Sequence, residues 1–216
     1  MTPTLIYCYD AYCGWCYGFS PVIKKIAGEY KDNLDIEVLS GGMMIGEKIM
    51  PIEKIGPFIQ SSYKRVEELT GIKFGEDFLW HVFNPEQSDW VMNSEKPAIA
   101  LSIFKEYLPE QQLDFATDLQ YALNYEGRDL DDDEAYRHLL EKYSIQPEAF
   151  YRKLKSKEYK EAAYYEFSLC KQLQVTGFPT VFIQTGELKF AMVARGYTAY
   201  GDLKERIENV LQETGE

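Results

Sequence analysis

The pattern of apolar and polar residues in the first 42 positions predicts a strand, a helix and a second strand. Thr4 to Tyr9 is short, apolar and rich in residues that favour strands, which is typical of a buried strand. From Cys16 to about Tyr30 the apolar residues recur at helical spacing, and Pro21 within this segment predicts a kink. Leu34 to Leu39 then alternates as a strand does, and a Ser-Gly-Gly sequence ends it.

The last quarter of the chain predicts a hairpin and a helix. Thr180 to Gln184 and Phe190 to Arg195 are two strand-like runs, separated by a turn at Thr185 to Glu187. From about Ala199 to Gln212 the apolar residues fall on one face of a helix. Strands from both ends of the chain can therefore join one sheet.

Residues 49–172 predict helices throughout. Glycines mark two helix ends, at Gly71 and Gly127. Helix starts are marked by Asn93 or Ser94, by Pro109, by a capping-box-like pair of Asp131 and Glu134, by Pro147 and by Lys157. The fold class is therefore α/β, with residues 1–48 and 173–216 in one domain and residues 49–172 inserted as an all-helical domain. We expect the inserted part to pack on the sheet as a lid or second lobe.

Composition narrows the class of partner. The 216 residues are 45% hydrophobic and 15% aromatic, which is enough to bury a core without disulfides. The formal net charge is −12, and no run of Lys or Arg offers the basic face that nucleic acid or an anionic membrane needs. We therefore expect neither nucleic acid nor a membrane as a partner.

The expected cellular compartment limits the roles that the four cysteines can have. The first apolar segment begins almost at once and has no basic region before it, unlike a secretory signal, and no apolar run approaches the roughly 20 residues of a membrane span. We therefore expect a cytoplasmic protein, in which thiols are kept reduced. Cysteines in that compartment indicate catalysis, metal binding or burial, and not a disulfide framework.

The sequence Cys13-Gly14-Trp15-Cys16 is the strongest candidate for chemistry, because it lies where a strand turns into a helix. Free N–H groups and the dipole at a helix N-terminus favour a thiolate, which is the nucleophile of disulfide exchange. At the start of the helix, Cys13 would attack a substrate disulfide. One turn further in, Cys16 would resolve the mixed disulfide.

A second candidate segment precedes the predicted hairpin. Thr176-Gly177-Phe178-Pro179-Thr180 places a proline at the entrance of a strand, where no backbone donor is needed. A cis peptide bond before Pro179 would turn the Phe178 backbone outward, where it could pair with an extended peptide. An ordinary trans-proline loop is the alternative.

These two segments together resemble the thioredoxin superfamily, and the helical insertion narrows the resemblance to its DsbA-like branch. Within that branch the chain is similar to a cytoplasmic group of predicted protein-disulfide isomerases related to FrnE. The similar segments are Tyr9-Asp10, GWCYGFSP at 14–21, SGGMMIG at 40–46, LTGIKFGEDF at 69–78, NSEKPA at 93–98 and YEGRDL at 125–130.

The resemblance implies a thioredoxin-like fold and a role for each residue of the two segments. Cys13 would be the nucleophile and Cys16 the resolving thiol. Pro179 would be the cis-proline that abuts the thiol pair, and Phe178 beside it would contact the substrate together with Gly14 and Trp15. No cofactor is implied, and the partners would be protein disulfides or small thiols such as glutathione.

The dipeptide between the cysteines departs from periplasmic DsbA, because it contains no histidine. A histidine there would add positive charge near the thiolate. We therefore expect a couple less oxidising than the roughly −120 mV of DsbA, and reductase or isomerase activity in place of net oxidation.

Other residues have weaker claims to a function. Cys8 and Cys170 are most simply small buried residues, with a redox role as the alternative. Glu37 is charged within an apolar strand, so it is either a proton acceptor below Cys16 or a solvent-facing residue at the edge of the sheet. Residues around the thiol pair or the following loop, namely Asp10, Tyr12, Trp15, Met43 and Met44, would shape substrate access or pack in the core.

Metal binding has little support in the sequence. The spacing of Cys8, Cys13 and Cys16 matches a plant-type iron–sulfur pattern, but a cluster loop would break both the strand and the helix start. There is no second CxxC, and His81 and His138 lack the ligand spacing of a zinc site. The acidic run from Asp131 to Glu134 is explained better as a solvated helix start.

Two other function classes remain open. A glutathione-dependent isomerase or transferase is one, because the related chromene-carboxylate isomerases share this fold, although they use a lone Ser or Cys at the Cys13 position. A non-enzymatic adaptor that delivers a client to a protease through the helical part is the other.

Overall fold

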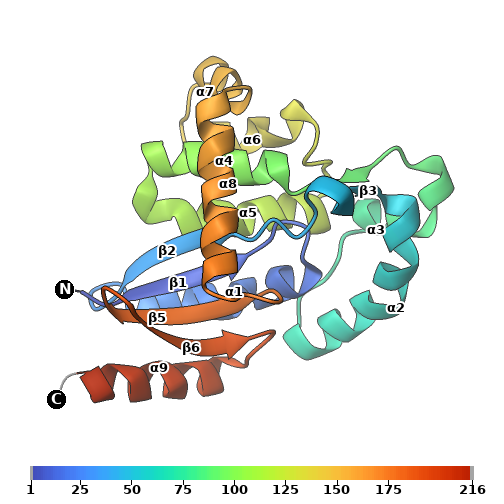
Figure 1. Ribbon diagram of the computed structural model, residues 1–216. Helices are drawn as coiled ribbons and strands as arrows, with labels where there is room; N and C mark the ends of the chain where they lie inside the picture. The colour runs from blue at the N-terminus through green and yellow to red at the C-terminus, as the bar shows by residue number, and fades with distance from the viewer. Residues whose placement is uncertain (1, 215–216) are drawn as a thin grey trace.

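The computed structural model describes residues 2–214, and a four-stranded sheet lies at its centre (Figure 1). The strands, in sheet order, are β2 Asp35–Ser40, β1 Thr4–Tyr9, β5 Thr180–Gly186 and β6 Lys189–Arg195. β1 pairs parallel with β2 and antiparallel with β5, and β5 pairs antiparallel with β6. The two central strands therefore come from opposite ends of the chain, as the sequence predicts.

Most of the remaining described chain is helical. The helices are α1 Gly14–Glu29, α2 Ile52–Thr70, α3 Glu76–Phe83, α4 Glu95–Tyr107, α5 Gln112–Asn124, α6 Arg137–Lys142, α7 Pro147–Leu154, α8 Lys157–Gln172 and α9 Tyr200–Thr214. Within residues 2–214 no helix is both long and apolar enough to cross a bilayer.

The segment between β2 and β5 is helical as predicted, with one addition. Met50–Pro51 (β3) pairs antiparallel with Val91–Met92 (β4), which joins the start of α2 to the segment before α4. Two-residue strands are too short to give a periodic pattern, so the sequence analysis does not predict this ladder.

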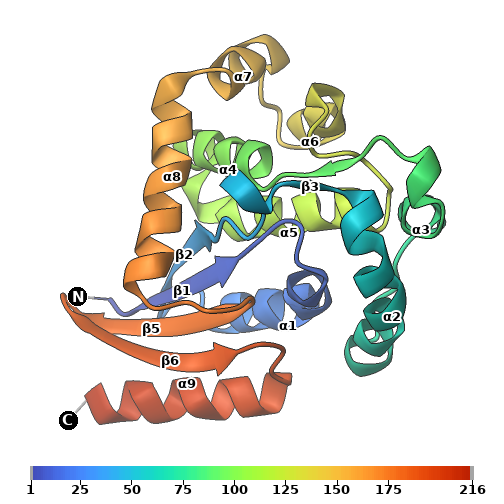
Figure 2. The same ribbon diagram turned by 45° about the vertical axis from the view of Figure 1, so that its right-hand side comes forward.

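Helices cover both faces of the central sheet, with α1 and α9 on one face and α8 on the other (Figure 2). The alternation of β1 sorts its side chains between them. Leu5 and Tyr7 enter the large core that includes α1, whereas Ile6 and Cys8 enter a smaller cluster with residues of α8.

The start of α1 and the end of α2 carry their expected signals. α1 begins two residues earlier than the apolar spacing predicts, with Cys13 as its N-cap, and it continues through Pro21. Gly71 is the C-cap of α2, which confirms the prediction. Its φ of 77° is left-handed, a conformation in which a residue with a side chain would be strained.

Two predicted helix starts are wrong in detail. The Oδ1 atom of Asp129 accepts from the backbone N of Asp131 at 2.9 Å, so Asp131 belongs to the preceding turn. Asp132 is the N-cap instead; it accepts from the N of Glu134 at 3.1 Å and opens only a short 3₁₀ turn. Pro109 also opens a 3₁₀ turn, and α5 begins after it.

The outer edge of β2, which pairs with no other strand, is covered by a glutamine side chain from α5. Gln112 Oε1 accepts from the backbone N of Val38 at 2.9 Å, and its Nε2 donates to the Ile36 carbonyl at 2.9 Å. The side-chain amide thus replaces a neighbouring strand and protects the edge from pairing with another chain.

Candidate functional site

The two cysteines of the CxxC are placed by the turn between β1 and α1. The backbone N of Cys13 donates to the Asp10 carbonyl at 3.1 Å, and the N of Tyr17 donates to the Cys13 carbonyl at 3.1 Å, which closes the first turn of α1. Cys13 is 7% exposed and Cys16 is 0% exposed. One thiol therefore lies at the surface of the site and the other lies wholly behind it.

The environment of the two thiols differs. Both are free, as are Cys8 and Cys170. Burial raises the pKa of the Cys16 thiol well above its ordinary value, and the adjoining Cys13 side chain raises it further. Cys16 is thus held as a neutral thiol at neutral pH.

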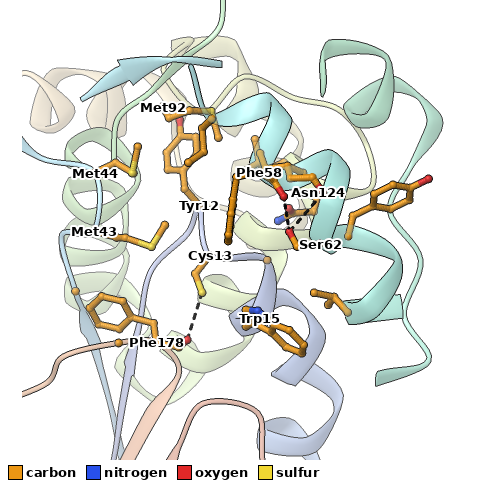
Figure 3. Close-up of a pocket in the computed structure, with 18 of the residues that line it drawn as sticks. Tyr12, Cys13, Trp15, Met43, Met44, Phe58, Ser62, Met92, Asn124 and Phe178 are labelled. Carbon is orange, nitrogen blue, oxygen red and sulfur yellow. Dashed lines mark hydrogen bonds between the residues drawn. The ribbon is translucent and has the colours of Figure 1, made fainter. Parts of the chain in front are cut away.

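The loop before β5 reaches Cys13 from the opposite end of the sequence. The Phe178–Pro179 peptide bond is cis. The Cys13 Sγ donates to the Phe178 carbonyl at 3.5 Å, the contact drawn as a dashed line in Figure 3. Pro179 itself does not line the adjoining cavity, and its carbonyl accepts from the backbone N of Gly196 at 2.7 Å.

A cavity of about 510 Å³ opens beside Cys13. Figure 3 shows Phe178 and the methionines 43 and 44 on one side of Cys13 and residues of α2 on the other. The described lining residues are Tyr12, Cys13, Gly14, Trp15, Gly41, Gly42, Met43, Met44, Lys48, Ile55, Phe58, Ile59, Ser62, Tyr63, Val66, Phe74, Phe78, Met92, Leu123, Asn124, Val175, Thr176, Gly177 and Phe178. Lys48 is the only charged residue in this set, and apolar side chains dominate it.

The carboxylate of Asp10 ties three segments together behind the cavity, a role that the sequence analysis missed. Its Oδ1 accepts from the backbone N of Tyr12 at 3.0 Å and from Ser94 Oγ at 2.9 Å, and its Oδ2 accepts from the N of Met43 at 2.7 Å. Burial raises the pKa of Asp10, although these hydrogen bonds oppose the shift. Asp10 therefore fixes the CxxC turn against the Gly41–Met44 loop and the start of α4.

The side chain of Ser94 does not cap α4, because its hydroxyl donates a hydrogen bond to the Asp10 carboxylate. Ser94 Oγ also accepts from the backbone N of Met44 at 3.0 Å. Asn93 takes the capping role, since its Oδ1 accepts from the N of Glu95 at 3.0 Å. The Asp-before-CxxC and Asn-Ser-Glu segments were visible in the sequence, but only the fold brings them together.

Glu37 does not lie below Cys16, so the proton-acceptor hypothesis is wrong. It is opposite Ile6 in the β1–β2 register, on the face of the sheet that α8 covers, whereas Cys16 packs on the other face. Its carboxylate accepts from Lys105 Nζ at 2.7 Å, and its side chain is 42% exposed. Glu37 does lie on an edge strand and is partly exposed, but Lys105 holds its carboxylate, so the alternative of a solvent-facing edge position is confirmed only in part.

Cys8 and Cys170 form a second pair of thiols, behind the loop that carries Phe178. They are 0% and 2% exposed and share an apolar cluster with Leu39 and Phe182. The pKa of Cys170 is raised far above its ordinary value, mainly by the interaction with the Cys8 thiol and secondly by burial. Both are therefore small buried residues, as the simpler interpretation predicts.

The two histidines have packing and hydrogen-bonding roles, and burial lowers the pKa of His138, so its contact with Glu126 is not an ion pair at neutral pH. The ring of His81 stacks on Trp90 with centroids 3.9 Å apart, and His138 Nε2 lies 3.1 Å from a carboxylate oxygen of Glu126. Among residues 2–214 no three His, Cys, Asp or Glu side chains gather as a metal site would require.

The sheet, the thiol pair at the helix start and the adjoining cis-proline loop define a thioredoxin-like protein with a helical insertion. A family model described as a DSBA-like thioredoxin domain matches residues 4–208. The chain therefore belongs to the DSBA-like thioredoxin family. A comparison with curated proteins gives no match.

Solved structures show the same fold over nearly the whole chain. A Nitrosomonas europaea protein, provisionally named a protein disulfide isomerase, is 23% identical with a TM-score of 0.84, and 99% of each chain is covered. The cytosolic disulfide reductase DsbM from Pseudomonas aeruginosa is 25% identical with a TM-score of 0.73, and 97% of this chain and 98% of DsbM are covered. A 2-hydroxychromene-2-carboxylate isomerase is 14% identical with a TM-score of 0.66 and 98% coverage of each chain, which shows the fold alone.

These comparisons confirm the DsbA-like branch that the sequence motifs indicate. The family and its structural neighbours include disulfide oxidoreductases, which makes a redox enzyme the supported class. The narrower relation to the FrnE group stays a prediction.

Proposed function

We propose that this protein is a dithiol–disulfide oxidoreductase that works through Cys13 and Cys16. The observation that carries the proposal is the thiol pair at the N-terminus of α1, with Cys13 beside a cavity and Cys16 buried behind it. Free N–H groups at this position favour a thiolate.

The reaction has two exchange steps. The Cys13 thiolate attacks a substrate disulfide, a Cys13–substrate disulfide forms, and one substrate sulfur leaves as a thiol after taking up a proton. Cys16 then loses its proton and attacks Cys13 Sγ, which forms the Cys13–Cys16 disulfide and releases the second substrate thiol. The substrate gains two electrons, and the enzyme dithiol loses them.

The direction of electron flow follows from the dipeptide and the location. Gly14 and Trp15 supply no positive charge beside the thiolate, so the couple is expected to be more reducing than that of DsbA. The similarity to cytosolic DsbM supports a cytoplasmic location. Reduction or isomerisation of disulfides is the activity that agrees with both the expected potential and the proposed location.

The cavity limits the substrate to a group that can enter beside Cys13. Its volume of about 510 Å³ is within the range of small-molecule sites, and it can also hold one or two side chains of a polypeptide. DsbM has been solved with GSH, which supports a glutathione-like thiol as one partner. Protein disulfides are the other proposed partner, with Gly14, Trp15, Phe178 and Pro179 as the proposed contacts.

The reduction potential of the Cys13–Cys16 pair tests the proposed direction. We expect a value closer to the roughly −270 mV of thioredoxin than to the roughly −120 mV of DsbA. Equilibration with glutathione buffers, followed by alkylation and mass spectrometry, measures it. A value near that of DsbA would make the protein an oxidant, and failure to form any Cys13–Cys16 disulfide would contradict the proposed function itself.

The substitution Gly41→Ala is expected to disturb the site without unfolding the protein. A Cβ at Gly41 would lie 2.0 Å from the Phe178 ring, so the ring must move within the cavity that Cys13 also lines. Misplacement of a substrate contact by about 1 Å can lower kcat/KM about a hundredfold, and we expect a loss of ten- to a hundredfold. Steady-state kinetics with a disulfide substrate measure the loss.

Gly28→Ala is the matched control for Gly41→Ala. Gly28 lies in α1, and a Cβ there would meet nothing within 4 Å. Its kcat/KM should equal that of the wild type, and alanine should favour the helix by up to about 1 kcal/mol. Equal activity of Gly41→Ala and Gly28→Ala would show that the position of Phe178 does not matter for the reaction.

A further inference from the structure

The second exchange step places an unusual demand on Cys16. Its thiol must become a thiolate while it is 0% exposed, and burial opposes the charge. The negative charge of Asp10 opposes it further, whereas Cys13 carries no charge at this step because its sulfur is bonded to the substrate. A hydrogen-bond donor at Cys16 Sγ would therefore have a large effect on this step.

Most polar groups around Cys16 are already committed to other partners. The Asp10 carboxylate accepts three hydrogen bonds, from the backbone N of Tyr12, the backbone N of Met43 and the Ser94 hydroxyl. The Ser20 hydroxyl, one turn along α1, lies 3.0 Å from Gln120 Oε1 and 3.2 Å from the Cys16 carbonyl oxygen. Neither of these side chains has a donor directed at the Cys16 sulfur, although a backbone hydrogen bond from Asp10 lowers the pKa of Cys16 and partly opposes the effect of burial.

Tyr7 is the exception. It lies on β1 and belongs to the same core as Cys16, and its side chain is 0% exposed. Its ring packs between Tyr9 and Phe19, at centroid distances of 5.7 and 6.0 Å, which fixes the direction of the hydroxyl. Among residues 2–214 the hydroxyl has no hydrogen-bond partner.

The Tyr7 ring packs against Phe19, one turn after Cys16 on α1, so this unpartnered hydroxyl lies in the part of the core that holds the thiol pair. Burial raises the pKa of Tyr7 well above its ordinary value, and the charges of Cys16 and Cys13 and a side-chain interaction with Cys16 raise it further. A buried hydroxyl without a partner costs free energy, and a thiolate at Cys16 would supply a partner and offset that cost.

We propose that the Tyr7 hydroxyl is a catalytic residue of the second exchange step, in which it donates a hydrogen bond to the Cys16 thiolate. This inference rests on the proposed function of the Cys13–Cys16 pair. Cys16 gives its proton to solvent or to the departing substrate thiolate, and Tyr7 keeps its own proton throughout, because its raised pKa excludes it as a base. The bond from Cys16 Sγ to Cys13 Sγ forms as the bond from Cys13 to the substrate sulfur breaks.

The substitution Tyr7→Phe tests this role, because it removes only the hydroxyl and keeps the packed ring. A charged acceptor makes the lost hydrogen bond a strong one, so we expect resolution to slow by about tenfold or more. Attack by Cys13 on the substrate disulfide should keep its wild-type rate. Rapid mixing, acid quenching and mass spectrometry separate the two steps, and the mixed disulfide on Cys13 should accumulate.

The pH dependence gives a second readout that loss of packing would not change. In the mixed disulfide Cys13 does not titrate, so the titratable groups that act on Cys16 in this step are Asp10, Tyr7 and Tyr9. Without the Tyr7 donor the Cys16 thiolate is less stable, so the rise of the resolution rate with pH should move to higher pH. The attack step should keep its pH profile.

Tyr136→Phe is the matched control. Tyr136 is also 0% exposed, but its hydroxyl donates to the Leu130 carbonyl at 2.6 Å, away from the thiols. Its resolution rate should equal that of the wild type. A wild-type resolution rate in Tyr7→Phe, or equal slowing in both variants, would overturn the role of Tyr7. A wild-type protein that forms no mixed disulfide at all would instead overturn the proposed function.

Discussion

A Cys13→Ser variant is expected to lose disulfide exchange completely, down to the rate of the buffer alone. A serine hydroxyl at the start of α1 is not ionised at neutral pH and cannot attack a disulfide as a thiolate does. The side chains are similar in size and the position is 7% exposed, so the fold should be unchanged. Reduction of a fluorescent disulfide substrate, with circular dichroism to check folding, measures the result.

Cys16→Ser separates the two steps and distinguishes the remaining function classes. In this variant Cys13 still attacks, but the mixed disulfide cannot be resolved and should accumulate as a stable adduct. A glutathione-dependent isomerase or transferase would keep its turnover without Cys16. A non-enzymatic adaptor would bind its client equally well with both cysteines replaced. Persistent catalytic exchange in the Cys13→Ser/Cys16→Ser double variant would contradict the mechanism.

Lys105→Met is expected to destabilise the fold by about 3–5 kcal/mol, because it leaves a buried carboxylate without its partner. Lys105 Nζ lies 2.7 Å from Glu166 Oε1 and also contacts the Val38 carbonyl. The Glu166 side chain is 9% exposed, and its other oxygen accepts from the backbone N of Ser40 at 2.8 Å. Urea unfolding at pH 7, followed by circular dichroism, measures the change in the free energy of unfolding.

The loss should depend on pH in a definite direction. Burial already raises the pKa of Glu166 above its ordinary value of 4.5, and removal of Lys105 takes away the charge that opposes this shift. A carboxyl whose folded-state pKa is raised costs stability above its unfolded pKa, and the cost disappears as the pH falls toward that value. The difference between Lys105→Met and the wild type should therefore shrink between pH 7 and about pH 4.5.

Two further variants decide whether the unpaired charge is the cause. In Lys105→Met/Glu166→Gln both charges are gone, so part of the lost stability should return. Lys142→Met removes a lysine of similar reach from a surface pair, 2.6 Å from Asp118, whose lysine side chain is 55% exposed. That change should cost less than about 1 kcal/mol. Equal losses in Lys105→Met and Lys142→Met would contradict the buried-charge explanation.

The sequence predicted the local structure well wherever one segment carries its own signal. The strand before the CxxC, the hairpin and the terminal helix follow from apolar periodicity, and Gly71 marks the end of α2 by its left-handed conformation. The prediction failed where a short segment interacts with a distant one. The start at Asp131 and the two-residue strands β3 and β4 depend on partners that no local pattern reveals.

The features of the candidate site likewise fall into those that local sequence predicts and those that only the tertiary structure reveals. The sequence alone placed Cys13 and Cys16 at a strand-to-helix junction and marked Phe178 and Pro179, because spacing and turn chemistry are local properties. Which buried groups surround the thiols is a tertiary property. Side-chain alternation along β2 turned Glu37 away from Cys16, and the same alternation along β1 turned Tyr7 into the core that Cys16 shares.

The sequence by itself therefore determined the class of fold and the chemistry-bearing pair, since both are written within short segments of the chain. Only the tertiary structure decided that Asp10 joins three segments, that Lys105 pairs with Glu166, and that the Tyr7 hydroxyl is buried without a hydrogen-bond partner among residues 2–214. The physical reason is that burial and pairing of polar groups depend on residues far apart in the chain, such as Ser40 and Glu166 at 126 positions, which folding brings within hydrogen-bond distance.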